Sequence, residues 1–285
     1  MARFAARLHV LLARNAPTAV VIRRGPSKAV CTVGWDRRRD TFTLGQWLRG
    51  RIYERRSDLS PDGAHLIYFA MNGRWTSTTK GSWTAISRAP FLKAIALHAK
   101  GDCWHGGGLF LDNKSYWLNG AHTVLEDTRE VTRAAVTPYA PMYGGECPGV
   151  YFHRLERDGW TFRADLPLGS YLASATVWEK PIGHGWTLRK LAHATVGAPI
   201  GKSVYYDEHE LVGHGRELPR HDWEWADLDG KRLVWATGGT LHAGYLTKQS
   251  AKQDDPVDRP MLLHDFNPMQ FEAIAAPHSA RGRAR

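Results

Sequence analysis

Hydrophobic residues along this chain come in short runs, and almost every run ends at a turn-forming residue. Within the first fifty residues, four runs are separated by connections of hairpin length. Runs of this size, bounded by Pro, Gly, Asn and Asp, are typical of β-strands joined in hairpins. They occupy residues 8–13, 18–22, 29–35 and 41–47. The pattern therefore predicts a four-stranded up-and-down meander, the unit from which propeller blades are built.

The same pattern continues along the rest of the chain. Residues 87–100 are the best candidate for a helix, but Pro90 and the strand-like surroundings argue against one. No segment keeps a helical period over the ~10–12 residues that a typical helix needs, so the sequence predicts an all-β protein. The further strands are predicted at 52–53, 64–70, 83–87, 92–98, 109–111, 116–118, 150–155, 160–162, 175–178, 186–188, 202–206, 211–212, 223–226, 233–235 and 240–246.

Acidic turn positions recur at an interval close to the length of one blade. Asp62, Asp112, Asp158 and Asp207 are separated by 50, 46 and 49 residues. Four-stranded propeller repeats are ~40–50 residues long, so the spacing predicts a β-propeller of about five blades. We expect one domain over residues 1–276 and a disordered basic tail at 277–285.

Two segments carry a recognisable turn. Residues 58–68 read DLSPDGAHLIY and residues 225–235 read WADLDGKRLVW. Asp-Gly favours a tight hairpin because glycine accepts positive φ, and proline presets the preceding bend. The first segment resembles the Ser-Pro-Asp-Gly repeat of TolB-like (WD40-like) β-propellers, and the second resembles a copy without Ser-Pro. The resemblance implies the fold and brings no functional residue with it. Residues 24–27 and 50–53 are also similar to stretches of uncharacterised bacterial proteins, and no activity follows from that.

Composition adds aromatic residues and an uneven charge to this picture. The chain has twelve Trp, ten Tyr and nine Phe. We expect most of them in the core, with an exposed aromatic binding surface as the alternative. Residues 1–56 hold thirteen basic and three acidic residues, which accounts for the whole net charge of +10. Such a region either attracts nucleic acid, an acidic partner or an anionic membrane surface, or forms a solvated rim of arginines.

Cysteine usage and hydropathy bear on the compartment. Cys31, Cys103 and Cys147 are too widely spaced for a disulfide framework or a zinc motif, and a sparse, odd count is typical of a reducing cytoplasm. Charged residues interrupt the apolar residues at the N-terminus, and no run of ~18 apolar residues occurs. We therefore expect neither a secretory signal nor a transmembrane helix, and predict a cytoplasmic protein.

Catalytic and cofactor motifs are missing from the sequence. It contains no phosphate-binding Gly-rich motif before Lys-Ser/Thr, no His-Glu-x-x-His and no Gly-x-Ser-x-Gly. We expect no cofactor and no metal, because residues 103–105 supply too few ligands for one. Residues 106–108, three consecutive glycines, indicate either a flexible linker or a close approach of two backbones.

Two groups of residues remain as candidates for a site. Asp58, Asp102, Glu146 and Glu224 lie near strand entries and could act as paired acids if the fold brought them together. The segment 49–56 is the densest in arginine; as a strand it would place Arg51, Tyr53 and Arg55 on one face, able to hold a carboxylate or phosphate. The alternative is an ion-paired strand in which Arg55 or Arg56 holds Asp58. The candidate ligand-binding residues are Arg51, Tyr53, Arg55, Arg56, Asp58, Trp104, His105 and Glu224.

The leading functional prediction is a non-enzymatic propeller scaffold that binds a protein or an acidic ligand. It rests on the fold analogy and on the missing catalytic motifs. The first alternative is a glycan-active or other hydrolase with acids converging in a central pocket. A nucleic-acid or anionic-surface binder acting through residues 1–56 ranks third, because no nucleic-acid module accompanies the charge.

Overall fold

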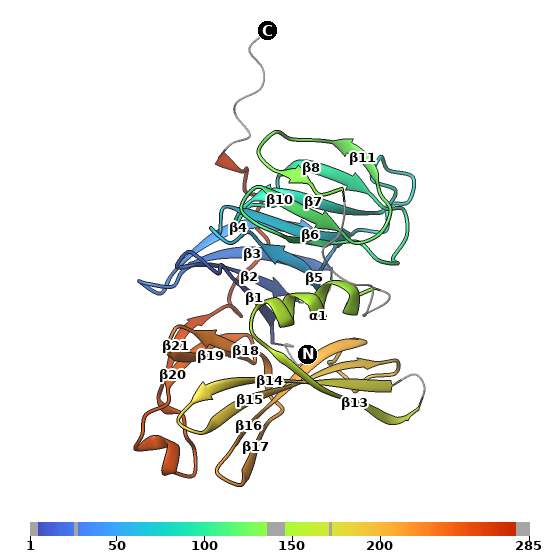
Figure 1. Cartoon of the computed structure of the whole chain (residues 1–285). Coiled ribbons are helices and arrows are strands. Elements are labelled where there is room, and N and C mark those ends of the chain that lie inside the picture. The colour runs from blue at the N-terminus through green and yellow to red at the C-terminus, as the bar shows by residue number, and fades with distance from the viewer. Residues whose placement is uncertain (1–4, 26–27, 136–145, 171–172, 278–285) are drawn as a thin grey trace. The chain divides into compact units, whose positions relative to one another are not determined.

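The computed structural model describes residues 5–25, 28–135, 146–170 and 173–277, and its strands form five sheets (Figure 1). This confirms the predicted all-β class. Contacts divide the chain into two compact units: unit 1 is Met1–His9 with Leu155–Pro268, and unit 2 is Val10–Arg154 with Met269–Arg285. The single domain over 1–276 stays a prediction, and residues 278–285 of the predicted tail lie outside the described residues.

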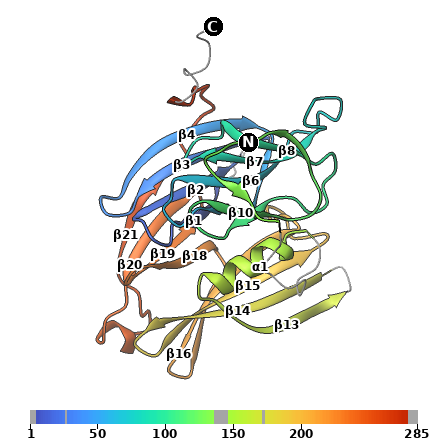
Figure 2. The same cartoon turned by 45° about the horizontal axis from the view of Figure 1, so that its top comes forward.

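The first sheet is the predicted meander. Its strands follow one another in the order β1-β2-β3-β4 (Figure 2), and β3 pairs antiparallel with both β2 and β4. Because the connections are short, each strand pairs with its neighbour in sequence. The hairpin pattern was therefore sufficient to predict this sheet. The strands are β1 Arg7–Leu12, β2 Thr18–Arg24, β3 Ala29–Asp36 and β4 Thr41–Arg49.

The second and third sheets belong to unit 2 and depart from a regular blade. The second has the order β11-β8-β7-β6-β5, and the third has the order β12-β10-β9 with β10 and β12 parallel. The second sheet therefore keeps four consecutive strands, β5 to β8, and adds β11 beside β8, while the third sheet has only three strands. The strands are β5 Arg51–Leu59, β6 His65–Met71, β7 Ser82–Arg88, β8 Ala94–Ala99, β9 Gly108–Phe110, β10 Ser115–Leu118, β11 Thr123–Glu126 and β12 Thr132–Arg133.

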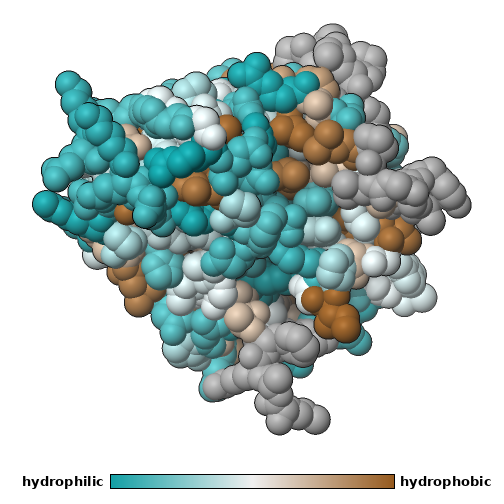
Figure 3. All heavy atoms as spheres, turned by 90° about the horizontal axis from the view of Figure 1, so that it is seen from below, coloured by the Kyte–Doolittle hydropathy of each residue, from teal (hydrophilic) through white to brown (hydrophobic). Residues whose placement is uncertain are grey.

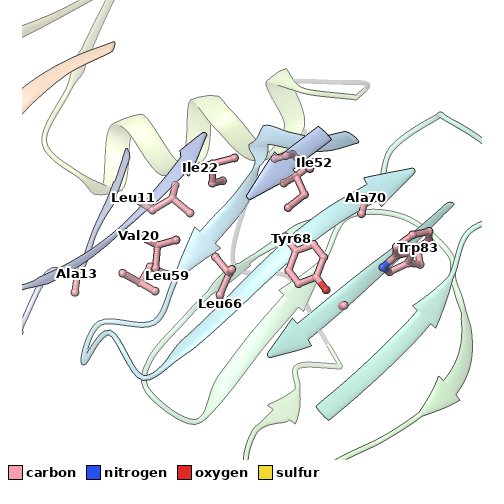
Figure 4. Packing of buried hydrophobic residues seen from close by; sticks show 12 residues of the cluster. Leu11, Ala13, Val20, Ile22, Ile52, Leu59, Leu66, Tyr68, Ala70 and Trp83 are labelled. Atoms are coloured by element: carbon pink, nitrogen blue, oxygen red, sulfur yellow. The ribbon is translucent and has the colours of Figure 1, made fainter. Parts of the chain in front are cut away.

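The core of unit 2 lies between the first and second sheets. Ile22 from β2, Ile52 from β5 and Leu66 from β6 are fully buried in one cluster of apolar side chains (Figure 4). Tyr68 joins them and donates its hydroxyl to the Leu92 carbonyl at 2.6 Å. Burial of this apolar area is the main favourable term in the folding of the unit.

The strand predicted at 150–155 is wrong, because these residues form the helix α1, Pro148–Arg157. Pro148 occupies the first helical position, where its missing N–H costs nothing. Gly159 follows the helix with φ +86°, and its N–H donates to the Glu156 carbonyl at 3.0 Å. Val150, Tyr151 and Leu155 are buried at the i, i+1, i+5 spacing of one helical face. Their hydrophobicity alone could not distinguish that face from a strand.

Unit 1 contains the fourth and fifth sheets. Their orders are β13-β14-β15-β16-β17 and β18-β19-β20-β21, all antiparallel between neighbours. A short 3₁₀ helix, η1 Ser250–Lys252, lies between the last two strands. The strands are β13 Thr161–Ser170, β14 Ala173–Gly183, β15 Trp186–Thr195, β16 Tyr205–Gly213, β17 Arg216–Arg220, β18 Trp223–Asp229, β19 Arg232–Thr237, β20 Thr240–Tyr245 and β21 Asp258–Asp265.

The turn predicted at Asp207 and Glu208 is wrong, because β16 runs straight through both residues. Asp207 pairs with Ala192 of β15 and is buried. The Lys190 ammonium, also buried, lies 4.0 Å from its carboxylate and offsets the charge. The repeat of acidic turns consequently ends at Asp158, and the fourth position of the predicted series is a strand.

The Ser-Pro-Asp-Gly turn adopts the predicted geometry. Gly63 has φ +72°, and the Ser60 hydroxyl donates to the Asp62 carboxylate at 2.6 Å. Partial burial acts to raise the pKa of Asp62, but hydrogen bonds from Ser60 and the Ala64 N–H outweigh it and the net shift is downward. The chain closes here because the carboxylate satisfies donors that the hairpin strands cannot reach.

Candidate functional site

The arginine-rich strand β5 does not alternate as the sequence pattern predicted. Tyr53 pairs with Phe69, whereas Asp58 pairs with Ile67, so residues 54–57 stand opposite a single residue of β6. A bulge of this kind re-aims side chains. Arg55 and Arg56 are both buried, whereas Arg51 and Tyr53 are half-buried and stack on each other.

Arg56 is the centre of this region, with only 1% of its surface exposed. Its guanidinium donates to the Cys103 carbonyl at 2.8 Å and to the His105 carbonyl, and it forms an ion pair with Glu146 at 2.5 Å. Its Nε lies 3.3 Å from the Cys147 sulfur. A planar fork of donors suits several acceptors at once. Arg56 therefore ties the segment 103–105 to β5, and its predicted contact with a ligand stays a prediction.

The three consecutive glycines make the close backbone approach that was one of the two alternatives. Gly106 and Gly107 have φ of +85° and +76°. A Cβ at Gly107 would collide with the Arg56 carbonyl, and one at Gly106 would lie 2.5 Å from the Phe69 ring. Only glycine fits both the angle and the space. This approach brings the carbonyls of the preceding loop within reach of the buried guanidinium.

Trp104 is held between these two anchored carbonyls. The carbonyls of Cys103 and His105 face Arg56, and the Trp104 side chain is 62% exposed. The Trp104 N–H donates to the Asp102 carboxylate at 2.8 Å, which fixes the turn. The hydrogen bonds of this loop therefore hold the Trp104 backbone in a position that leaves the indole exposed to solvent.

A second exposed indole lies on the neighbouring loop, between β6 and β7. Trp75 is 53% exposed, and its ring packs over Gly81. The Ser82 hydroxyl donates to the Asp102 carbonyl at 2.6 Å, and a Cβ at Gly101 would lie 3.4 Å from the Lys80 side chain. The two loops thus lie side by side at one end of the second sheet. We call residues 72–82 and 100–105, together with Arg51, the Trp75–Trp104 surface.

The charges of the Trp75–Trp104 surface are predominantly positive. Its one acid, Asp102, forms an ion pair with Lys100 at 2.7 Å. Arg74 and Lys80 are exposed, and neither forms an ion pair with a residue in the described ranges. Arg51 stacks on the Tyr53 ring at 4.4 Å. The surface therefore combines two indoles with three cations that no acid of the same surface neutralises.

The remaining candidates on β5 have local partners. The Arg55 guanidinium stacks on the Tyr151 ring at 4.8 Å, and the Asp58 carboxylate accepts the Phe110 N–H at 2.8 Å. Burial raises the pKa of the Tyr53 phenol, although the charges of Arg51 and Arg56 oppose the shift. The alternative of a strand held by internal pairing fits these residues better than a ligand grip, with Glu146 as the acid paired to Arg56.

The four acids proposed for catalysis have separate donors. Glu224 belongs to unit 1, where it accepts the Leu8 N–H at 2.8 Å. Asp58, Asp102 and Glu146 belong to unit 2 and bind Phe110, Lys100 and Arg56. Their convergence in one pocket stays a prediction that no contact described above supports.

Much of the N-terminal positive charge is used inside the fold. Arg23 is buried, stacks on Trp47 at 5.3 Å and donates to the Met269 carbonyl at 3.2 Å. Arg37 donates to the carbonyls of Ala13 and Ala16. These arginines contribute to packing and satisfy loop carbonyls, so the charge of residues 1–56 overstates the positive surface that they form.

Most tryptophans lie in the core, as expected, but two are exposed to solvent. Eight tryptophans are buried, among them Trp223, which stacks on Trp235 at 4.8 Å, and Trp225. The expectation that most tryptophans lie in the core is thereby confirmed. Trp75 was missed by the sequence analysis. The signal was available in residues 71–81, MNGRWTSTTKG, where a single indole stands in a polar loop with two cations and no acid.

Exposed aliphatic residues elsewhere are scattered. Ile200 is 98% exposed and Leu262 is 58% exposed. On the face drawn in Figure 3, hydrophobic residues form small patches separated by hydrophilic ones. Isolated exposed apolar residues are normal on soluble proteins. Among the residues that the structure describes, they form no surface comparable to the two neighbouring indoles.

The described residues contain neither a cluster of metal ligands nor a membrane-spanning helix. Among the residues that the structure describes, no three His, Cys, Asp or Glu side chains are grouped to bind a metal ion. Cys31, Cys103 and Cys147 carry free thiols. In the same part of the chain, no helix has the length and apolar character to cross a membrane.

Comparisons with known proteins leave the function open. No protein-family model matches the chain, and no curated protein sequence is similar to it. Among solved structures, the chain is similar to hydrazine synthase of Kuenenia stuttgartiensis, with a TM-score of 0.32 and 10% identity over 85% of this chain and 77% of that chain. A similarity of this size supports no statement about the arrangement of the sheets or the activity.

Proposed function

We propose that this chain is a non-enzymatic binding scaffold that holds an acidic ligand on the Trp75–Trp104 surface. The observation that carries the proposal is the pair of indoles, 53% and 62% exposed, on adjacent loops with uncompensated cations. Large exposed aromatic groups are expensive in water and are enriched where proteins bind partners. An acidic ligand is favoured because Arg74, Lys80 and Arg51 outnumber the acids of the surface.

The scaffold itself is proposed to be a propeller of about five blades, of the TolB-like kind. Support comes from the number of sheets, from the four-stranded meander at β1–β4, and from the Ser-Pro-Asp-Gly turn before β6. The cytoplasm is the proposed compartment, because free thiols suit a reducing environment.

The proposal is tested with dextran sulfate as an acidic polymer and uncharged dextran as its control. Isothermal titration should show binding to the sulfated polymer only, weakening as salt is added. The double variant Arg74→Ala/Lys80→Ala should bind at least about tenfold more weakly, since each cation contributes part of the attraction.

The matched control is Arg38→Ala/Arg39→Ala, which removes two exposed cations from the β3–β4 turn of the same unit. It should leave the affinity within about twofold, because only charges near the ligand matter at physiological ionic strength. Equal losses in the two double variants would mean a nonspecific charge effect, and would overturn the proposed surface.

A further inference from the structure

The indole of Trp75 presents a flat face to solvent. A Cβ at Gly81 would lie 2.5 Å from Cε3 and 2.8 Å from Cδ2 of the ring, so one face rests on the glycine backbone. Gly81 has φ +78°, an angle that side-chain-bearing residues rarely adopt. With 53% of Trp75 still exposed, the opposite face is available for stacking.

The backbone that carries the Trp104 indole is anchored on both sides. The carbonyls on either side of it are bonded to the buried Arg56, and its own N–H is bonded to Asp102. An indole has only two side-chain torsions, so it loses little conformational entropy when a ligand stacks on it. Two separate stacking positions thus exist on adjoining loops.

Cations accompany both stacking positions. Arg74 precedes Trp75 directly in sequence, and the Lys80 side chain reaches Gly101 on the loop that carries Trp104. Lys80 therefore lies at the junction of the two loops. The guanidinium of Arg51 lies 4.4 Å from the centre of the Tyr53 ring at the same end of the sheet, where Arg51 pairs with Met71.

We propose that the ligand of the Trp75–Trp104 surface is single-stranded nucleic acid, with bases stacked on the two indoles and phosphates paired with Arg74, Lys80 and Arg51. This inference rests on the function proposed above. Single-stranded binders combine a positive surface that follows the backbone with aromatic rings on which successive bases stack. Acidic peptides use the cations without needing flat rings, and neutral sugars use the rings without needing cations. Stacked bases must be unpaired, which excludes a duplex from these positions.

The test is fluorescence anisotropy of labelled oligothymidylate and oligouridylate with the full chain. Replacement of one ring, Trp75→Ala or Trp104→Ala, should weaken binding about 5- to 150-fold, the range expected for one stacked base. Trp75→Phe should recover most of the loss, because a phenyl ring still stacks. The logarithm of the affinity should fall with the logarithm of salt with a slope of about −2 for three phosphate contacts.

A matched control is Phe162→Ala, which removes a ring that is 40% exposed on β13 of unit 1. It should change the affinity by less than about twofold. Circular dichroism of every variant establishes that each one is folded before binding is compared. Binding of a duplex of the same length should be at least tenfold weaker.

The outcomes separate the two proposals. If the oligonucleotides fail to bind but dextran sulfate binds through Arg74 and Lys80, the scaffold stands and the nucleic-acid assignment is wrong. If the oligonucleotides bind with unchanged affinity in both tryptophan variants, the stacking positions are wrong. If neither polymer binds, both proposals are overturned.

Discussion

The sharpest structural prediction concerns Arg56→Lys, which keeps the charge and removes the fork. In the native chain one guanidinium serves the carbonyls of Cys103 and His105 together with Glu146. A lysine ammonium is a compact donor and can keep the ion pair with Glu146, but it cannot reach both carbonyls as well. The variant therefore leaves two carbonyls at this buried site without their donor.

The magnitude follows from those two carbonyls. A hydrogen bond from a charged donor contributes about 1.5–3 kcal/mol when buried, and both bonds here are only partly buried, so Arg56→Lys should lower the free energy of unfolding by about 1–3 kcal/mol. The loop holding Trp104 should also exchange its amide hydrogens faster, since two of its anchors are lost. Urea denaturation followed by tryptophan fluorescence measures the first effect, and hydrogen exchange of residues 100–107 measures the second.

The control is Arg88→Lys, because Arg88 binds Glu130 through two nitrogens but is 45% exposed. An exposed ion pair contributes no more than about 1 kcal/mol. A loss below 1 kcal/mol for Arg56→Lys, or an equal loss for both variants, would refute the view that Arg56 anchors the loop.

Two further predictions concern backbone space and pH. Gly107→Ala should lower the free energy of unfolding by at least about 2 kcal/mol, because φ is +76° and the new Cβ would meet the Arg56 carbonyl. Gly183→Ala, with φ +96° and open space around the Cβ, should lower it by only about 1 kcal/mol. Thermal unfolding of the two variants distinguishes these effects. Burial, followed by the charge of Lys190, lowers the pKa of His209 to about 3, so between pH 6.5 and 3 the unfolded chain binds the proton first and stability falls as the pH falls. Urea titrations at pH 8 and 5 should show the native chain losing about 2 kcal/mol through this group, a loss that His209→Asn avoids; identical pH dependence in both would contradict the assignment.

Strands joined by short hairpins were predictable, and elements that depend on distant partners were not. The meander of β1–β4 needs only its own turns, so its runs and turn residues were enough. Asp207 looked like a turn residue because its partner Lys190 comes from another strand. The helix α1 was missed because its apolar residues formed a run as short as a strand.

The candidate ligand-binding residues stay a prediction, and the structure divides them between an exposed loop and a buried strand. Trp104 lies on the Trp75–Trp104 surface, and His105 is exposed beside it. Arg55 and Arg56, predicted to touch a ligand, are buried by a bulge in β5. A bulge depends on the register with β6, and nothing in residues 51–59 alone reveals it.

The segment with the highest positive charge in the sequence does not supply most of the positive charge at the exposed indoles. Loops such as 103–107 carry carbonyls that no strand can satisfy, and buried carbonyls need donors. Arginine supplies several donors from one side chain, and Arg56 and Arg37 use theirs to bind loop carbonyls inside the fold. The cations beside the exposed indoles, Arg74 and Lys80, come instead from the part of the sequence whose formal charges balance. A search for the binding surface in this chain should therefore follow cations that lack acidic partners, and not the density of arginine along the sequence.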